Sequence, residues 1–166
     1  MMRRACRNAL LAALLPLLAG TAPVRAEAPA AGVFAELTAP LEIVVDRDPS
    51  RIAAAKRLAR LYAEAGQWDA AWRVLERSGP YALKNAEYQG FAGTVLHRMK
   101  QLPAAAAFYR RAIALQPEDG RWWVGLGLTL ADAGLRKEAR QAFAAARERA
   151  QTLPPALMKI AERYGD

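Results

Sequence analysis

AEYQGFAGTVLHRMKQLPAAAAFYRRAIALQPED, residues 86–119, is followed directly by GRWWVGLGLTLADAGLRKEARQAFAAARERAQTL, residues 120–153, which has the same length. The preceding stretch, IAAAKRLARLYAEAGQWDAAWRVLERSGPYALKN at 52–85, aligns with both without a gap, so the period is 34 residues. Equivalent positions carry matching side chains in all three copies: Ala71, Ala105 and Ala139; Leu75, Tyr109 and Phe143; Ser78, Ala112 and Ala146; and Ala59, Gly93 and Gly127. A repeat of this length predicts stacked copies of one small helical unit.

Each copy has the pattern of two amphipathic helices joined by a short break. Apolar residues recur at three- and four-residue steps in both halves, and the breaks read AGQW, KQLP and AGLR. Small residues at facing positions let two helices approach closely, and the bulky residue fills the seam between them. This order of small, bulky and small residues is typical of the tetratricopeptide repeat (TPR). We therefore expect an all-α TPR solenoid of three helix-turn-helix units (52–85, 86–119 and 120–153), closed by a capping helix at 155–166.

The N-terminus has the pattern of a secretory signal peptide. Three arginines precede an apolar run of about 12 residues, and cleavage is predicted after Ala26. The run is short for a membrane span, which needs roughly 20 residues, so a retained anchor at 1–26 is the alternative and no stable span is expected after cleavage. Cleavage would remove the single cysteine, four of the 24 basic residues and none of the 16 acidic residues, which leaves a net charge of +4. The predicted location is the periplasm or another exported compartment.

Residues 27–50 are expected to form an irregular lead-in, because prolines at 29, 40 and 49 interrupt any helix. The run LEIVV at 41–45 is the only clear β-prone segment in the chain. One interpretation is a short strand packed against the first helices. The other is a strand that is offered to a partner protein.

Patterns for catalysis and for metal binding are missing from the sequence. His97 is the only histidine, and no cysteine follows Cys6, so we expect neither a metal site nor thiol catalysis. The GLG at 125–127 lacks the preceding strand and the third glycine of a dinucleotide-binding motif. A net charge of +4 is too weak a bias for nucleic-acid binding. We expect a non-enzyme that takes no cofactor, no nucleic acid and no small-molecule substrate; an enzyme or enzyme accessory is the remote alternative.

The predicted functional surface is a concave groove formed by the first helix of each unit. A resemblance to other TPR domains assigns to it Lys56, Arg60, Phe91, Thr94, His97, Arg98, Arg121 and Gly125. Its basic residues partly resemble the carboxylate clamp of chaperone-binding TPR domains. However, Arg60 and Thr94 stand where that clamp has asparagines, and Gly125 replaces a basic residue. The groove is therefore expected to hold an extended acidic or mixed segment of a protein partner. For His97 the alternative is a surface position without a functional role.

The stretch WWVGLG at 122–127 combines two tryptophans with two glycines. Trp123 and Gly127 occupy the bulky and small positions of the first helix, so we interpret both as packing residues. Gly125 is expected to leave space on the concave side. Trp122 shares a helix face with Leu126, which predicts a place in the seam with the second unit or, alternatively, an exposed anchor for a partner.

A narrower resemblance covers residues 52–165. The segments AEYQGF, LHRMKQ and AAAAFYRRAIALQPEDGRWWVGLG, together with the tail LPPALMKIAERYG, are similar to the C-terminal TPR region of MshN-like proteins, which are associated with biogenesis of MSHA-type (type IV) pili. That family has an inner-membrane anchor and a longer proline-rich linker, where this sequence has a signal peptide and a short lead-in. The resemblance implies an exported scaffold that binds another protein during assembly of a type IV pilus or related secretion system. The alternative is a periplasmic adaptor for envelope maintenance or cell division.

Overall fold

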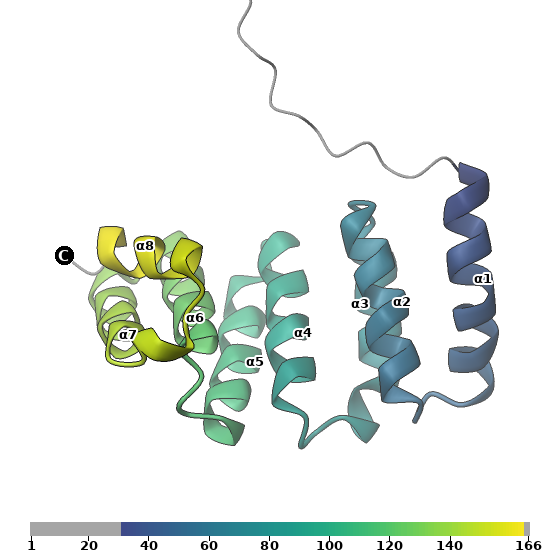
Figure 1. Ribbon diagram of the computed structural model, residues 1–166, viewed down its shortest axis with the longest axis horizontal. Helices are drawn as coiled ribbons and strands as arrows, with labels where there is room; N and C mark the ends of the chain where they lie inside the picture. Colours follow the sequence, from purple (N-terminus) through teal and green to yellow (C-terminus); the bar gives the residue numbers. More distant parts are fainter. Residues whose placement is uncertain (1–30, 165–166) are drawn as a thin grey trace, which may run out of the picture.

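The computed structural model describes residues 31–164, which form a row of packed helices (Figure 1). No strand occurs within this range, so the expected all-α architecture is confirmed. The predicted signal peptide at 1–26 lies outside the described residues. None of the described helices combines the length and the apolar character needed to cross a bilayer. In chain order the elements are α1 (Ala31–Arg47), α2 (Ile52–Glu64), α3 (Trp68–Ser78), the 3-10 turn η1 (Gly79–Tyr81), α4 (Ala86–Arg98), α5 (Leu102–Leu115), α6 (Gly120–Asp132), α7 (Arg136–Arg147), the 3-10 turn η2 (Ala150–Thr152) and α8 (Pro155–Tyr164).

Each 34-residue unit holds one pair of helices, α2–α3, α4–α5 or α6–α7. The first helix of every pair ends at the same repeat position in a left-handed backbone conformation, with φ of +75° at Gly66, +61° at Lys100 and +78° at Gly134. Glycine adopts this conformation freely, whereas Lys100 adopts it at a cost of about 1–2 kcal/mol. The next residue then donates its backbone N–H to the carbonyl five residues earlier, at 2.8 or 2.9 Å in all three units. This Schellman-type end reverses the chain and sets the second helix against the first.

The repeat positions that define the period form the core of each hairpin. The alanine, bulky and small positions of all three second helices are at most 5% exposed. The small residue of the first helix is matched in size to the bulky residue of the second helix. Ala59 of the first unit shares a cluster with Leu75, and the other two units place a glycine against a larger aromatic ring. A Cβ atom added to Gly93 would lie 3.1 Å from the Tyr109 ring, and one added to Gly127 would lie 2.8 Å from Phe143. Close packing therefore favours glycine at this position in the second and third units, most strongly at Gly127.

Residues 31–47 form the helix α1, so the expectation of an irregular lead-in with a strand at 41–45 is wrong. One side of α1 is built at steps of four, three and four residues by Phe34, Thr38, Leu41 and Val45. Thr38 is 4% and Val45 2% exposed, because this side packs against the neighbouring helices. Such packing outweighs the β preference of the run LEIVV, since tertiary contacts commonly override local propensity.

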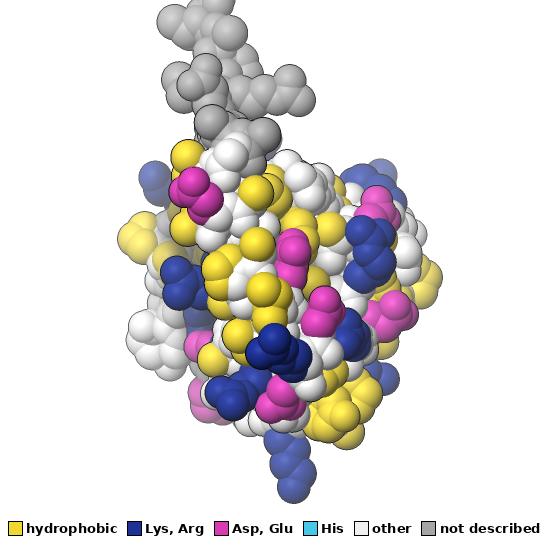
Figure 2. Space-filling model, turned by 90° about the vertical axis from the view of Figure 1, so that its right-hand side faces the viewer, with side chains coloured by type: hydrophobic (Ala, Val, Ile, Leu, Met, Phe, Trp, Pro, Cys, Tyr) yellow, Lys and Arg dark blue, Asp and Glu magenta, His cyan; other side chains and the backbone are white. Residues whose placement is uncertain are grey.

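Polar contacts tie α1 to the first hairpin despite Pro40 in its interior. Proline removes one backbone donor from a helix and typically costs about 3 kcal/mol. The Tyr62 hydroxyl donates a hydrogen bond to Glu42, and Arg77 donates both to the Asp46 carboxylate and, at 2.8 Å, to its carbonyl oxygen. Because residues 41–45 are helical, they are not a strand that a partner could pair with. Figure 2 views the molecule from the α1 end and shows hydrophobic side chains exposed there among charged ones.

The last helix, α8, packs across α7 at the other end of the row. Ala161 is fully buried, and Leu157 and Ile160 are partly buried against the core of the third hairpin, which is the side expected for them. Tyr164 stacks on Phe143 with ring centres 5.7 Å apart. The polar residues between these positions are exposed, so α8 covers the third unit with a water-compatible surface.

Candidate functional site

The first helices of the three units, α2, α4 and α6, line a common cavity of about 210 Å³. We call it the α2–α4–α6 cavity. The structure brings five of the eight predicted groove residues to it, together with an acidic residue and an indole ring. The lining residues are Lys56, Arg60, Glu87, Phe91, Thr94, Arg121 and Trp122.

Lys56 and Glu87 form an ion pair inside the cavity and link α2 to α4. The Lys56 ammonium lies 2.7 Å from the Glu87 carboxylate. The hydrogen bond from Lys56 and the charge of its ammonium hold the pKa of Glu87 below its usual range. The carboxylate therefore offsets part of the positive charge that the sequence predicted for this groove.

The two arginines of the cavity are held in different ways. Asp119 caps α6, because its carboxylate accepts the backbone N–H of Arg121 at 3.0 Å and also lies 2.6 Å from the Arg121 guanidinium. Arg60 instead places its guanidinium 5.8 Å from the centre of the Phe91 ring, a cation–π contact. Among the described residues Arg60 has no ion-pair partner, so it is the cation most accessible to an incoming carboxylate.

Thr94 and Gly125 both contact Tyr109. The Thr94 hydroxyl lies 3.0 Å from the Tyr109 hydroxyl and donates to the Gly90 carbonyl at 3.1 Å. A Cβ atom added to Gly125 would lie 2.3 Å from a carbon of the Tyr109 ring. The expectation that Gly125 leaves open space on the concave side is therefore wrong, because the Tyr109 ring occupies that space.

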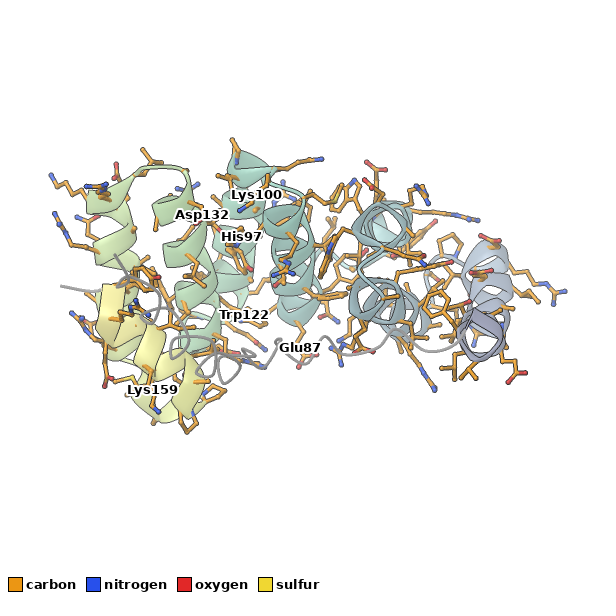
Figure 3. The ribbon with its side chains drawn as sticks, turned by 90° about the horizontal axis from the view of Figure 1, so that it is seen from above. Glu87, His97, Lys100, Trp122, Asp132 and Lys159 are labelled. Atoms are coloured by element: carbon orange, nitrogen blue, oxygen red, sulfur yellow. The ribbon has the colours of Figure 1, made fainter. Side chains whose placement is uncertain are left out.

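Two predicted groove residues lie away from the cavity, at the C-terminal end of α4. His97 contacts the Asp132 carboxylate at 3.0 Å, and Lys100 contacts the same carboxylate at 3.1 Å. These three side chains lie together in Figure 3, separated from Glu87. The hydrogen bonds from His97 and then Lys100 hold the pKa of Asp132 below its usual range. This cluster joins α4 to the end of α6, and its geometry indicates a structural contact.

Arg98, the other predicted groove residue at the C-terminal end of α4, lies toward the first unit. Its guanidinium lies 4.9 Å from the centre of the Trp68 ring, at the start of α3. This cation–π contact crosses the seam between the first and second units. Arg98 is therefore not part of the α2–α4–α6 cavity.

Trp122 is only 8% exposed, so the predicted place in the seam with the second unit is correct and the alternative, an exposed anchor, is wrong. A Cβ atom added to Gly90 would lie 2.2 Å from the Trp122 ring, which shows how closely α6 approaches α4. The indole N–H is buried without a hydrogen-bond partner. The sequence carries a signal for this burial, because the equivalent position of the second unit is also aromatic, Tyr88. Tyr88 is buried as well, with 1% exposed.

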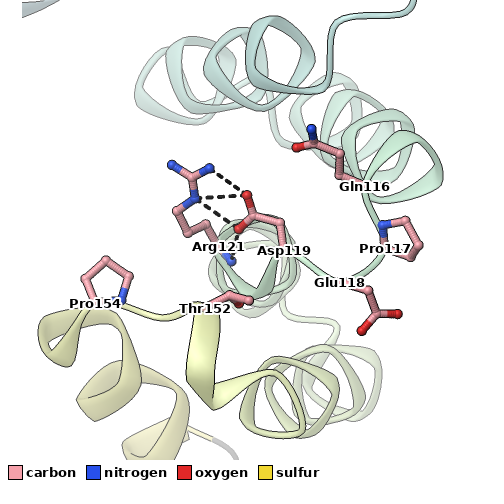
Figure 4. A pocket seen from close by; sticks show the side chains of 7 residues that line it. All are labelled: Gln116, Pro117, Glu118, Asp119, Arg121, Thr152 and Pro154. Atoms are coloured by element: carbon pink, nitrogen blue, oxygen red, sulfur yellow. Dashed lines mark hydrogen bonds and ion pairs between the residues drawn. The ribbon is translucent and has the colours of Figure 1, made fainter.

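A larger pocket, of about 590 Å³, lies beside the cavity where the α5–α6 connection meets η2 (Figure 4). Sequence reasoning missed it, because two connections about 34 residues apart build it and only their prolines give a signal. The Pro117 carbonyl fixes one wall by accepting hydrogen bonds from Trp123 at 2.9 Å and Arg149 at 2.6 Å. Arg121 lines both the pocket and the cavity. The lining residues are Gln116, Pro117, Glu118, Asp119, Arg121, Thr152 and Pro154.

The sequence matches no protein-family model, and a comparison with curated proteins gives no match. Solved structures do match. The structure of MamA is 20% identical, with a TM-score of 0.69 over 81% of this chain and 85% of that chain. YrrB, described as a TPR protein with an unusual peptide-binding site, is 19% identical, with a TM-score of 0.63 over 80% and 78%. The Yersinia enterocolitica type III secretion chaperone SycD, in complex with a peptide of the translocator YopD, is 16% identical, with a TM-score of 0.61 over 68% and 91%.

This chain has the TPR fold. At these identities the likeness shows the fold alone, and the resemblance to MshN-like proteins stays a prediction. The TPR solenoid places its three first helices next to one another, and the α2–α4–α6 cavity is the feature that all three share. Within residues 31–164, no group of three or more His, Cys, Asp or Glu side chains comes together as a metal site would require.

Proposed function

We propose that this TPR chain is an exported, non-catalytic scaffold that binds another protein during assembly of a type IV pilus or related secretion system. The observation that carries the binding role is the α2–α4–α6 cavity, in which cationic and aromatic side chains from three successive units converge. Two structural neighbours support it, because YrrB is described with a peptide-binding site and SycD is described in complex with a peptide. Export and the pilus role rest on the signal-peptide pattern and on the resemblance to MshN-like proteins.

The cavity suits an extended acidic segment. A carboxylate of the partner would bind the Arg60 guanidinium, which has no ion-pair partner among the described residues, and an apolar side chain would pack on Phe91. Such charge-assisted hydrogen bonds are stronger than neutral ones. A second carboxylate would have to compete with Glu87 for Lys56, so the cavity selects for acidic segments only moderately.

A capture experiment with matched variants tests the proposal. The purified chain would be used to capture partners from the native envelope, in parallel with a variant in which Lys56, Arg60 and Arg121 are changed to Gln. A control variant loses the same charge at three exposed positions outside the cavity, through substitution of Lys84, Lys137 and Lys159 by Gln. We expect pilus or secretion components to be captured by the parent and the control, and to be lost with the cavity variant.

Other outcomes separate the alternatives. Capture of cell-division or peptidoglycan-associated proteins would favour the envelope adaptor over the pilus scaffold. Equal capture by the parent and the cavity variant would exclude the cavity as the binding site. A reaction that is catalysed by the parent chain and lost on substitution of His97 would be required to support an enzyme.

A further inference from the structure

The two ends of the solenoid differ in the surfaces that they expose. At the C-terminal end, α8 turns polar side chains outward, among them Lys159 and Arg163. At the N-terminal end, α1 exposes Val33, Leu37 and Val44 by 51%, 42% and 38%. Figure 2 shows hydrophobic side chains on the surface at this end. Terminal elements of a repeat array normally require a polar outer face for solubility. The outer face of α1 therefore has the character of a surface that is covered by another element.

The repeat register shows which element that is. The end of α1 at Arg47 lies two periods before the end of α5 at Leu115, and the start of α2 at Ile52 lies two periods before the start of α6 at Gly120. The connection at 48–51 thus corresponds to the connection at 116–119, and α1 corresponds to α5, the second helix of a unit. By this register α1 is the second helix of a fourth unit that would span residues 18–51.

Burial in α1 confirms this register and identifies the uncovered side. The positions equivalent to Thr38 and Val45 are Ala106 and Ile113 of α5, which pack with residues of the following unit. Thr38 and Val45 are buried in α1. Leu37 and Val44 are equivalent to Ala105 and Ala112, which are fully buried in the hairpin between α4 and α5. In α1 these same two positions are exposed. Among residues 31–164, no helix occupies the place of the first helix of this unit.

The sequence that precedes α1 is a poor candidate for that helix. Residues 18–30 read LAGTAPVRAEAPA and contain prolines at 23 and 29. Arg25 would stand at the repeat position that is Ala59, Gly93 or Gly127 in the other units, where the two helices of a hairpin approach closely. An arginine there would hold the helices apart. The occupant is therefore expected to come from another molecule.

We infer that α1 of a second copy of this chain packs antiparallel on α1 and completes both incomplete units as a homodimer. The two helices of a hairpin run antiparallel, so an antiparallel α1 reproduces the packing of the other units. A twofold axis beside Leu41 sets Leu37 of one copy opposite Val44 of the second copy, and the symmetry repeats this contact. The apolar face of α1 is thus complementary to itself.

Charge favours the same arrangement. Glu36 and Arg47 are exposed toward opposite ends of α1, and neither forms an ion pair with another described residue. The antiparallel pair brings Glu36 of each copy toward Arg47 of the other, whereas a parallel pair would set like charges side by side. Opposite charges therefore meet at both ends of the helix pair.

The oligomeric state tests this inference directly. The chain as produced in cells, with its N-terminus determined by mass spectrometry, would be examined by sedimentation velocity over a wide range of concentration. We expect a monomer–dimer equilibrium that Leu37→Lys shifts to monomer. The control Leu83→Lys adds the same charge at a leucine that is 64% exposed in the loop before α4, and should leave the dimer unchanged. Circular dichroism would confirm that both variants are folded.

Two further variants fix the orientation. Glu36→Arg and Arg47→Glu should each weaken the dimer several-fold, and the double variant should restore it. With any retained Cys6 replaced by Ser, a mixture of Leu37→Cys and Val44→Cys chains should form the mixed disulfide in excess over either homodisulfide. A parent chain that stays monomeric at every concentration, a dimer that survives Leu37→Lys, or homodisulfides in excess would each overturn the inference.

Discussion

The packing of Gly125 against Tyr109 leads to the sharpest stability prediction. A Cβ atom at position 125 would lie 2.3, 2.6 and 2.9 Å from three carbons of the Tyr109 ring. Ordinary carbon contacts are about 3.5–4.0 Å, so Gly125→Ala requires the ring to move by more than about 1 Å. The ring is confined, because Gly93 also packs closely against it, so that a Cβ atom added there would lie 3.1 Å from the ring, and its hydroxyl is hydrogen-bonded to Thr94 at 3.0 Å.

The expected size of the effect follows from two opposing contributions. Alanine is more favourable than glycine in a helix interior by about 1 kcal/mol. Overpacking of a confined core site typically costs about 1–3 kcal/mol, and the confined ring places this site at the upper end of that range. We therefore expect Gly125→Ala to lower the free energy of unfolding by about 2 kcal/mol. For a chain of this length that corresponds to a fall in Tm of about 4–8 °C.

Urea and thermal unfolding followed by circular dichroism would measure the change. Gly32→Ala is the control, because a Cβ atom there meets nothing within 4 Å and the substitution should not lower stability. In a background of Tyr109→Leu, which carries the residue found at the equivalent Leu75, the same Gly125→Ala change should stabilise the chain by about 1 kcal/mol. If Gly125→Ala leaves Tm unchanged with Tyr109 present, or has the same sign in both backgrounds, the close-packing argument is refuted.

Three other predictions concern ionisable groups. Glu87→Gln removes the competitor for Lys56, so binding of an acidic peptide should tighten by up to about fivefold in a titration, whereas Glu118→Gln should not change it. Burial raises the pKa of Tyr88 to about 12 from an ordinary value near 10. The stability that depends on its neutral hydroxyl is therefore complete below pH 10 and is lost as the pH rises through 12. Tyr88→Phe should reduce this fall in Tm at alkaline pH. The pKa of Asp132 is lowered, so its contribution to the free energy of unfolding is present above its ordinary pKa of 3.8 and is lost as the pH falls through the lowered value. Asp132→Asn should lower the free energy of unfolding by at most about 1 kcal/mol at pH 7, because the carboxylate is 43% exposed. In strong acid the substitution should have almost no effect.

The repeat makes the fold predictable, because one hairpin geometry satisfies the same small and bulky positions three times over. Ala71 and its equivalents can be assigned to the core from their recurrence every 34 residues. The helix α1 cannot be recognised in the same way, since Pro40 and the LEIVV run oppose a helix locally and only contacts with the first hairpin favour it. Its four-three-four spacing is nevertheless visible in the sequence.

The candidate site is predictable at the level of its helices but not of its contacts. Lys56 and Arg60 are placed correctly on the first helix of the first unit. The sequence does not indicate that Glu87 neutralises Lys56, because a contact between side chains 31 residues apart depends on the rotation of two helices that a repeat alignment does not specify. The assignment of His97 to the groove fails for the same reason, since its bond to Asp132 depends on that rotation as well.

Gly125 shows how units of equal length and similar fold form different seams. The repeat position that is Phe91 in the second unit is Gly125 in the third. The bulky residue of the preceding unit changes in the opposite sense, from Leu75 to the larger Tyr109. Phe91 packs on the cluster that contains Leu75, whereas Gly125 accommodates the larger Tyr109 ring. Exchanging units would place Phe91 against an aromatic ring and leave a void beside Leu75, and both changes are destabilising. Large and small residues are thus paired across each seam, and the pairing makes each seam specific for its own two units.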